Sequence, residues 1–206
     1  MFLLIGVVGS GIMAERLSPT DVGLQLFQNA AATAAVLVAI ISIFGTISAD
    51  FNPAVTVGAW LLGLRSGRQV PAMLGAQVLG GCLGTVLANL MFDLDWVDLS
   101  AQTRSGGHLW LAEVVATVGL LLVIFSLVRT ARHSAIPYVV GVYIGGAYYF
   151  TSSTSFANPA VTVARTLSDT FAGIEPSSAP MFIVMQAAGV GLAVVLVRVL
   201  FQPAGR

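Results

Sequence analysis

The hexapeptide Asn-Pro-Ala-Val-Thr-Val occurs twice in this chain, at Asn52–Val57 and again at Asn158–Val163. Asn is a favoured residue for capping a helix N-terminus, and Pro is favoured at the first helical position. Each copy opens a short apolar stretch, Pro53–Leu64 in one case and Pro159–Leu167 in the other. With a rise of about 1.5 Å per residue, such a stretch reaches about half-way across a bilayer core roughly 30 Å thick. One copy alone would fit an ordinary turn, but two copies predict a pair of half-helices.

The composition places these half-helices in a membrane. The 206 residues are 57% hydrophobic and 9% charged, with a mean hydropathy of +0.92, whereas a soluble domain carries about 25% charged residues. Apolar runs predict membrane-spanning helices at Val22–Ile47, Val70–Phe92, Leu109–Val128, Ile136–Phe150, Met181–Phe201 and, more briefly, Phe2–Met13. Because the run at Phe2–Met13 is too short to span a bilayer, we expect either a start further upstream or a partial first helix.

The features around the two copies also repeat. A span with Pro and, six residues later, Gln follows each copy, at Pro71 and Gln77 and again at Pro180 and Gln186. We therefore predict one channel domain over residues 1–206, built from the halves 1–100 and 101–206. Three spans in each half make the second copy enter from the opposite face, so the repeats are inverted. Inverted repeats with short, Pro-interrupted segments point to a solute site near the membrane midplane.

The chemistry expected at that midplane follows from the two helix N-termini. Each carries a partial positive charge of about half a unit, so two facing ends repel protons and other cations. The side-chain amides of Asn52 and Asn158 can donate hydrogen bonds at the same point. A neutral polar solute would be accepted there and a cation would not. The repeated hexapeptide is thus expected to build the two halves of one constriction.

Other classes of function find little support. The formal net charge is zero, which gives no reason to expect nucleic acid as a partner. The single cysteine, Cys82, excludes an intrachain disulfide and a cysteine metal cluster. No His, Cys and Asp residues have metal-ligand spacing, and no Ser–His–Asp or Cys–His arrangement is indicated. We therefore expect no enzymatic activity, no catalytic residues, no metal and no cofactor.

The orientation is predicted from arginine, since all nine basic residues are Arg. Six are expected on one side of the membrane and three on the other: Arg65, Arg68, Arg129, Arg132, Arg198 and Arg206 against Arg16, Arg104 and Arg165. The side with more arginine is expected to be cytoplasmic. This predicts a multi-pass protein of the plasma (inner) membrane with a cytoplasmic C-terminus.

The paired boxes Asn52-Pro53-Ala54 and Asn158-Pro159-Ala160, set in inverted three-span halves, resemble the aquaporin family, also called the major intrinsic proteins. The resemblance covers nearly the whole chain, from about Gly9 onward. It implies an all-α membrane fold of six tilted helices and two half-helices. It also implies a homotetramer in the lipid bilayer, one pore per subunit, and passive flow of water or small neutral solutes.

One departure from the family pattern bears on the solute. The family usually has Arg directly after the second box, in its narrow outer filter, but this chain has Val161. Arg165 lies one helical turn further toward the outer mouth and could reach back to fill the vacancy. The Val and the run Arg165–Ile174 resemble a bacterial branch associated with arsenic-resistance clusters. That resemblance suggests glycerol-like solutes or neutral metalloids such as arsenous acid.

The other filter positions follow from the same resemblance. Counting back from Asn158, the position on the fifth span falls on Gly146, and the position just before the second box falls on Ser155. The position on the second span falls on Thr33, or on Ala32 if the following loop is one residue short. Together with Val161 these residues predict a wide filter without a fixed charge.

Four polar residues allow two interpretations each. Glu113 is either a proton site or a brace for the nearby half-helix loop, and the family resemblance favours a brace. Gln77 and Gln186 are expected to brace loops rather than bind solute. Asp50, where the family usually has His, either attracts cations or pairs with an arginine. The alternatives to a channel are a proton-coupled secondary transporter that uses Glu113 and a non-conducting structural membrane protein.

Overall fold

The computed structural model describes residues 1–201, and every regular element in that range is helical. The first half of the chain contains α1 (Phe2–Leu17), α2 (Val22–Phe44), α3 (Pro53–Leu61) and α4 (Val70–Met91). The second half contains α5 (Gly107–Arg129), α6 (Ile136–Phe150), α7 (Pro159–Ala164) and α8 (Ala179–Leu200). A short 3₁₀ turn precedes α4 at Gly67–Gln69, and another precedes α6 at His133–Ala135. A third follows α7 at Arg165–Leu167. The predicted all-α membrane fold is confirmed.

Both halves arrange their helices in the same way. The first helix of each half packs against its second helix and against its last, so α1 contacts α2 and α4 while α5 contacts α6 and α8. The contact between α2 and α6 joins the two halves. At that crossing Gly141 allows a close approach, because an added Cβ would lie 2.8 Å from the carbonyl oxygen of Ala34. The two halves therefore form one bundle.

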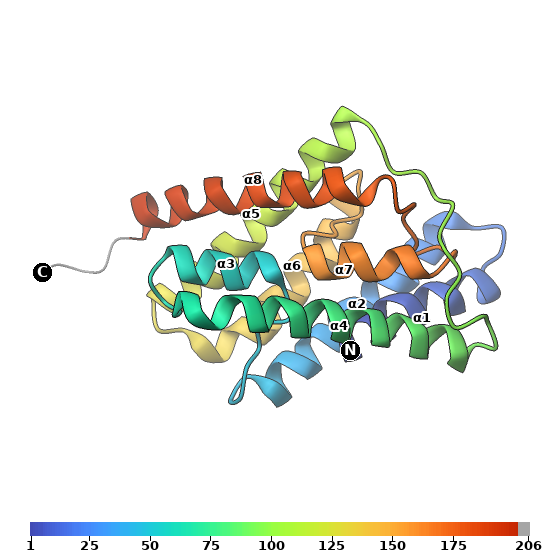
Figure 1. The fold of residues 1–206 in the computed structure, drawn as a ribbon, viewed down its shortest axis with the longest axis horizontal. Helices are drawn as coiled ribbons and strands as arrows, with labels where there is room; N and C mark the ends of the chain where they lie inside the picture. Colours follow the sequence, from blue (N-terminus) through green and yellow to red (C-terminus); the bar gives the residue numbers. More distant parts are fainter. Residues whose placement is uncertain (202–206) are drawn as a thin grey trace, which may run out of the picture.

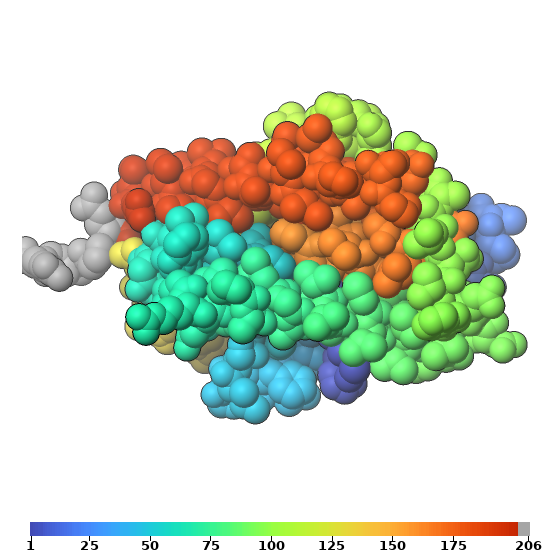
Figure 2. All heavy atoms as spheres, in the orientation of Figure 1, coloured from blue at the N-terminus to red at the C-terminus, as the bar shows by residue number. Residues whose placement is uncertain are grey.

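The two half-helices lie end to end in the middle of this bundle. Figure 1 shows α3 and α7 in one row between α4 and α8, and each of the two short helices contacts the other and both of these neighbours. The space-filling view in Figure 2 shows the same row closely packed between its neighbours. At the C-terminal end of α3, Nη2 of Arg198 donates to the carbonyl oxygen of Leu61 at 2.6 Å, which ties α8 to α3. Two short helices thus take the place of one further span.

Several helix ends differ from the sequence prediction. The first helix continues past Met13 to Leu17, because polar residues at the end of a membrane helix can remain helical beyond the apolar run. Arg16 in this added turn donates to the carbonyl oxygen of Phe92. The second helix stops at Phe44, three residues before the predicted end, and α3 stops at Leu61 instead of Leu64. These changes move boundaries and leave the order of elements as predicted.

The outer surface of the bundle is apolar. Four helices are long and apolar enough to cross a membrane: α2, α4 with its preceding turn, α5 and α8. Large apolar side chains on the surface are widely exposed, for example Leu79 at 67% and Val142 at 73%. Such exposure is unfavourable in water but is what the hydrocarbon core of a bilayer requires. The protein is therefore a multi-pass integral membrane protein.

Candidate functional site

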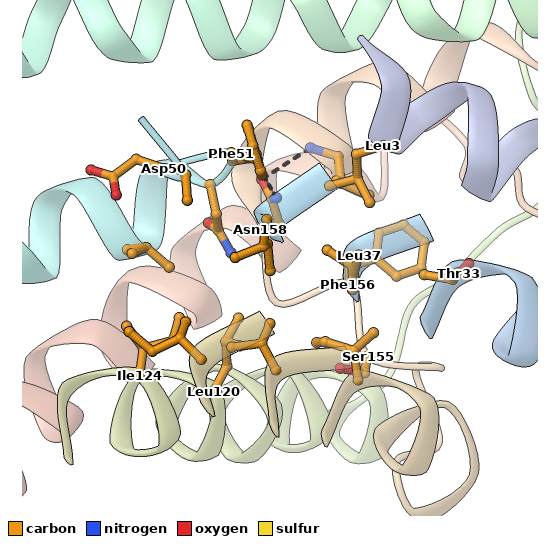
Figure 3. Close-up of a pocket in the computed structure, with 18 of the residues that line it drawn as sticks. Leu3, Thr33, Leu37, Asp50, Phe51, Leu120, Ile124, Ser155, Phe156 and Asn158 are labelled. Carbon is orange, nitrogen blue, oxygen red and sulfur yellow. Dashed lines mark hydrogen bonds between the residues drawn. The ribbon is translucent and has the colours of Figure 1, made fainter. Parts of the chain in front are cut away.

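A cavity of about 260 Å³ lies in the interior beside the two half-helices. Three long helices line it with residues four positions apart, which lie on one helix face: Thr33, Leu37 and Ile41 of α2; Leu120, Ile124 and Val128 of α5; and Ile136, Val140, Ile144 and Tyr148 of α6. The loops that carry the two Asn-Pro-Ala boxes form the facing wall. Figure 3 shows Leu120 and Ile124 across the cavity from Phe51 and Asn158. One wall is therefore mostly apolar and the other offers polar groups.

The two box asparagines meet at the centre of the polar wall. The amide nitrogen of Asn52 donates to the carbonyl oxygen of Ala157 at 2.7 Å, and that of Asn158 donates to Phe51 at 3.0 Å. Each amide oxygen caps its own half-helix, as Asn52 does by accepting from Ala54 N–H at 2.8 Å. An amide nitrogen carries two hydrogens, and the structure assigns one protein acceptor to each. Both side chains line the cavity, so the second hydrogen of each amide is available for a further hydrogen bond there.

The half-helix N-termini add positive potential at this point. Pro53 and Pro159 occupy the first helical position of α3 and α7, where the missing N–H costs no hydrogen bond. The reciprocal hydrogen bonds of the asparagines bring the two N-terminal ends together. Partial positive charges from both helices therefore face the same part of the cavity. This arrangement disfavours a cation and leaves a neutral solute unaffected.

Three of the predicted filter residues line one end of the cavity. Thr33, Ser155 and Val161 are all buried and all belong to the lining. Figure 3 shows Thr33 and Ser155 at the opposite end of the lining from Asp50. The hydroxyl oxygen of Thr33 lies 3.2 Å from that of Tyr148. The end of the cavity nearest the C-terminus of α7, here called the outer end, therefore carries three hydroxyl groups.

Gly146, which the sequence prediction assigned to the filter, lies outside the cavity lining. Gly146 is exposed on the outside of α6, and a Cβ added to it would meet only Phe150 of its own helix, at 3.9 Å. The face of α6 toward the cavity carries Ile144 and Tyr148 instead. Two residues along a helix correspond to a rotation of about 200°, so Gly146 points away. The phenol of Tyr148 lies at the outer end, where the sequence prediction placed a glycine.

Tyr148 is the site residue that the sequence interpretation missed. The signal was available, since Ile136, Val140, Ile144 and Tyr148 are each four residues apart and Gly146 falls off this line. Counting from the second box assumed the family spacing of the intervening loop. That loop is tightly folded, with positive φ angles at Thr154, Ser155 and Ala157. Helix periodicity was therefore a better guide than distance along the chain.

A fixed positive charge does reach the outer end. Arg165 is only 2% exposed, yet it belongs to the cavity lining. Its Nε donates to the carbonyl oxygen of Ala172, and its guanidinium carbon lies 3.5 Å from the ring centroid of Phe156. This is a cation–π contact. Arg165 therefore adds a guanidinium group to a lining that also contains Val161.

A second arginine supports this corner from the connection between α4 and α5. The guanidinium carbon of Arg104 lies 5.4 Å from the same Phe156 ring. Its Nε donates to the carbonyl oxygen of Gly173 at 2.8 Å, which holds the segment that accepts from Arg165. Burial lowers the pKa of Arg104, because removal from water disfavours its charged form. Arg104 does not line the cavity itself.

Glu113 lies behind the second box and outside the cavity lining. Its carboxylate oxygens accept from the backbone N–H groups of Phe156 at 3.0 Å and Ala157 at 2.9 Å. They also accept from the hydroxyl of Ser153 and from the amide of Gln186, each at 2.6 Å. The side chain is fully buried. Four donors and no contact with the cavity favour a brace over a proton site.

Gln77, the counterpart of Gln186 in the repeat, braces the loop of the first box. Its amide donates to the carbonyl oxygen of Asp50 at 2.6 Å and to the hydroxyl of Thr56 at 2.8 Å. Asp50 in turn forms an ion pair with Arg65, with 2.6 Å between Nη2 and Oδ2. Of the two interpretations of Asp50, the structure has the pair with arginine. Both members of this pair line the cavity. Among residues 1–201, no group of three His, Cys, Asp or Glu side chains is placed to hold a metal.

Apolar helices around an internal cavity, with two half-helices meeting beside it, define a multi-pass membrane protein with a partly polar cavity in its interior. The model of the family described as major intrinsic protein matches residues 1–155, and the chain belongs to this family. It is 47% identical over 203 residues to Aquaglyceroporin AqpS of Rhizobium meliloti (strain 1021), covering 98% of this chain and 86% of that protein. It is also 31% identical over 160 residues to Probable aquaporin AqpM of Archaeoglobus fulgidus, covering 69% of this chain and 63% of that protein.

Proposed function

We propose that this protein is a passive transmembrane channel for water and small neutral solutes. The observation that carries the proposal is the cavity beside the two facing half-helices, with Asn52 and Asn158 both in its lining. The similarity to one protein named an aquaglyceroporin and to another named a probable aquaporin supports the same class. Transport rather than catalysis is the role that this lining suits.

The solutes that we propose are glycerol-like molecules and neutral metalloids such as arsenous acid. Both carry several hydroxyl groups, which can exchange hydrogen bonds with Thr33, Tyr148 and Ser155 at the outer end. The positive charge of Arg165 and the two helix N-termini repel cations. A neutral hydroxylated solute meets no such barrier. Tyr148 restricts its cross-section, so we expect small solutes to be strongly preferred over larger ones.

Two alternatives remain open to test. A proton-coupled transporter would need Glu113 to exchange protons with the solute path, but its oxygens are occupied by four donors outside the cavity lining. A non-conducting structural protein would not need a lined cavity through its interior. Neither alternative has an observation in its favour comparable to the paired asparagines.

We further propose a homotetramer in the plasma (inner) membrane with the C-terminus in the cytoplasm. The exposed apolar side chains of α4 and α6 suit contacts with lipid or neighbouring subunits. The end of α8 with Arg198 lies against the end of α3, on the proposed cytoplasmic side. Arg206, which also counts toward this orientation, lies outside the described residues. Native mass measurement and accessibility of a tag at the C-terminus test the two statements separately.

The proposed function is tested by stopped-flow light scattering on vesicles that contain the purified protein. Water, glycerol, urea and arsenous acid are applied in turn, and empty vesicles give the background. We expect water flux and at least one hydroxylated solute flux well above background, with glycerol and arsenous acid faster than urea. Vesicles that match the background for all four compounds would exclude a channel of this class.

A further inference from the structure

The inner end of the cavity has a polar pair of its own. Asp50 and Arg65 line it together with the apolar side chains Leu64, Val128 and Ile136. Asp50 and Arg65 form the one ion pair between side chains of residues 1–201, with 2.6 Å between Nη2 of Arg65 and Oδ2 of Asp50. The one ion pair of these residues therefore lies on the wall of the cavity.

The pair is fixed from several sides. Gln77 donates to the backbone carbonyl oxygen of Asp50 at 2.6 Å. Nη1 of Arg65 lies 3.1 Å from the sulfur of Met73 on α4, so this side chain bridges the first box loop and the fourth helix. Such contacts already restrict the arginine side chain, so it loses less conformational entropy when it binds a partner. The pair is therefore a formed site rather than two mobile surface charges.

Part of the polar surface of the pair remains accessible, although Nε of Arg65 and Oδ2 of Asp50 are themselves buried. The side chains are 25% exposed for Arg65 and 19% for Asp50, and both belong to the cavity lining. A carboxylate accepts hydrogen bonds at two oxygens and a guanidinium has five N–H donors, so one contact does not saturate either group. Donor and acceptor capacity thus stand side by side. Their charges cancel, so the pair offers hydrogen bonds without attracting ions of either sign.

A hydroxylated solute needs such a site at this end. It loses hydrogen bonds to water as it enters a path whose wall is apolar at Leu64, Val128 and Ile136, and unreplaced hydrogen bonds are costly in such surroundings. A hydroxyl group is both donor and acceptor, so it can give its proton to Asp50 and receive one from Arg65. Water has the same ability but is small enough to pass with fewer replaced contacts.

We propose that Asp50 and Arg65 form an inner binding station for small neutral polyhydroxylated solutes, separate from the outer end at Thr33, Tyr148 and Ser155. The station determines how well such solutes compete with water for passage. The inference rests on the proposed channel function and names a second site within it. It assigns to the ion pair a role in selectivity beyond holding the first box loop.

The test uses the full chain in vesicles, with glycerol and water as probes and arsenous acid as a third. Asp50→Asn and Arg65→Gln each remove one charge, and the double variant removes both. Arg65→Lys keeps the positive charge but loses the fork of donors. Arg68→Gln is the matched control, since Arg68 is exposed in the same connection and does not line the cavity. Gel filtration in detergent confirms that each variant retains the wild-type assembly.

We expect Asp50→Asn and Arg65→Gln to lower the ratio of glycerol to water flux by about fivefold, as expected for the loss of one net hydrogen bond. Arsenous acid should follow glycerol, Arg65→Lys should lie between Arg65→Gln and the wild type, and Arg68→Gln should match the wild type. If Asp50→Asn yields no folded protein, the Arg65 series decides the question alone.

Two results would overturn the proposal of an inner binding station. One is an unchanged flux ratio in the Arg65 variants. The other is an equal fall of glycerol and water flux, which would make the pair a general brace of the inner mouth. A wild-type protein that passes no solute at all would instead overturn the proposed channel function. The failure of one proposal is therefore distinguishable from the failure of the other.

Discussion

The two loops that lead into the Asn-Pro-Ala boxes precede identical hexapeptides, but different side chains hold the two loops in place. The second loop is fixed by a buried carboxylate, since Glu113 accepts from two of its backbone N–H groups and from Gln186. The first loop relies on Gln77 and on the ion pair between Asp50 and Arg65. Within each box the contacts are nearly the same. The repeat therefore specifies the half-helix itself, and the surrounding helices decide how firmly each loop is held.

The two ends of the cavity differ in the same sense. An arginine lines each end, Arg65 at the inner end and Arg165 at the outer. The charge of Arg65 is balanced by Asp50, whereas Arg165 rests on the ring of Phe156 and the carbonyl oxygen of Ala172. The outer end thus carries positive potential and the inner end is neutral overall. Under the two proposals the outer end opposes cations and offers hydroxyl groups, and the inner end offers hydrogen bonds without a net charge.

The largest effect is expected from Glu113→Ala. The change leaves the backbone N–H groups of Phe156 and Ala157 and the amide of Gln186 without their charged acceptor. At about 1–3 kcal/mol for each unsatisfied buried donor, the loss of stability should reach about 3 kcal/mol or more. Thermal unfolding in detergent, followed by near-ultraviolet circular dichroism, measures it. Gln77→Ala, which removes the side-chain donor to the first loop, should cost less than half as much; equal costs would contradict the comparison of the loops.

A large change in selectivity is expected at the outer end. Arg165→Ala removes a bulky positive group from the cavity lining, so glycerol flux should rise several-fold relative to water flux. Val161→Arg adds such a group in the same turn and should lower glycerol and arsenous acid flux much more than water flux. Stopped-flow flux ratios in vesicles measure both changes. If neither substitution alters the ratio, the outer end does not select solutes.

A smaller change is expected at Tyr148. Tyr148→Ala should widen the outer end and raise glycerol flux a few-fold over water flux, because the phenol lies next to Thr33. Tyr148→Phe keeps the ring and loses only the hydroxyl group, so it serves as the control for size. Flux ratios that are the same for the alanine and phenylalanine variants would show that the ring does not limit the path.

No measurable change is expected at Gly146. A Cβ at this position meets only Phe150 at 3.9 Å, an ordinary contact distance, and points away from the cavity. Gly146→Ala should therefore leave water and glycerol flux as in the wild type. The same assay as for Tyr148 measures it, and a clear fall in glycerol flux would return Gly146 to the filter.

Much of the fold could be predicted from local sequence. The two hexapeptides combine a cap residue with Pro, and the structure starts α3 and α7 at Pro53 and Pro159. Apolar runs located the longer helices, because a bilayer demands a minimum apolar length. Helix ends were less predictable, as α1 shows by continuing to Leu17. Polar residues such as Arg16 end an apolar run without ending a helix.

The candidate site was only partly predictable, for a physical reason. Thr33, Ser155 and Val161 were placed on the lining, but counting along the chain chose Gly146 in place of Tyr148. Packing against neighbouring helices fixes which face of a helix points to the cavity. A loop of a different shape changes how residue number relates to that face. The position of Arg165 depends on Phe156 and on a carbonyl oxygen seven residues away in the chain, at Ala172. Such contacts are set by the folded chain and not by a motif.

The central claim is that the paired half-helices enclose a passive path for neutral solutes. Glycerol entry into vesicles with purified wild-type protein tests it most directly, measured with and without a proton gradient of either sign. The account predicts glycerol flux well above that of empty vesicles, equal in all three conditions. Glycerol flux at the background level, or flux that reverses with the proton gradient, would contradict it.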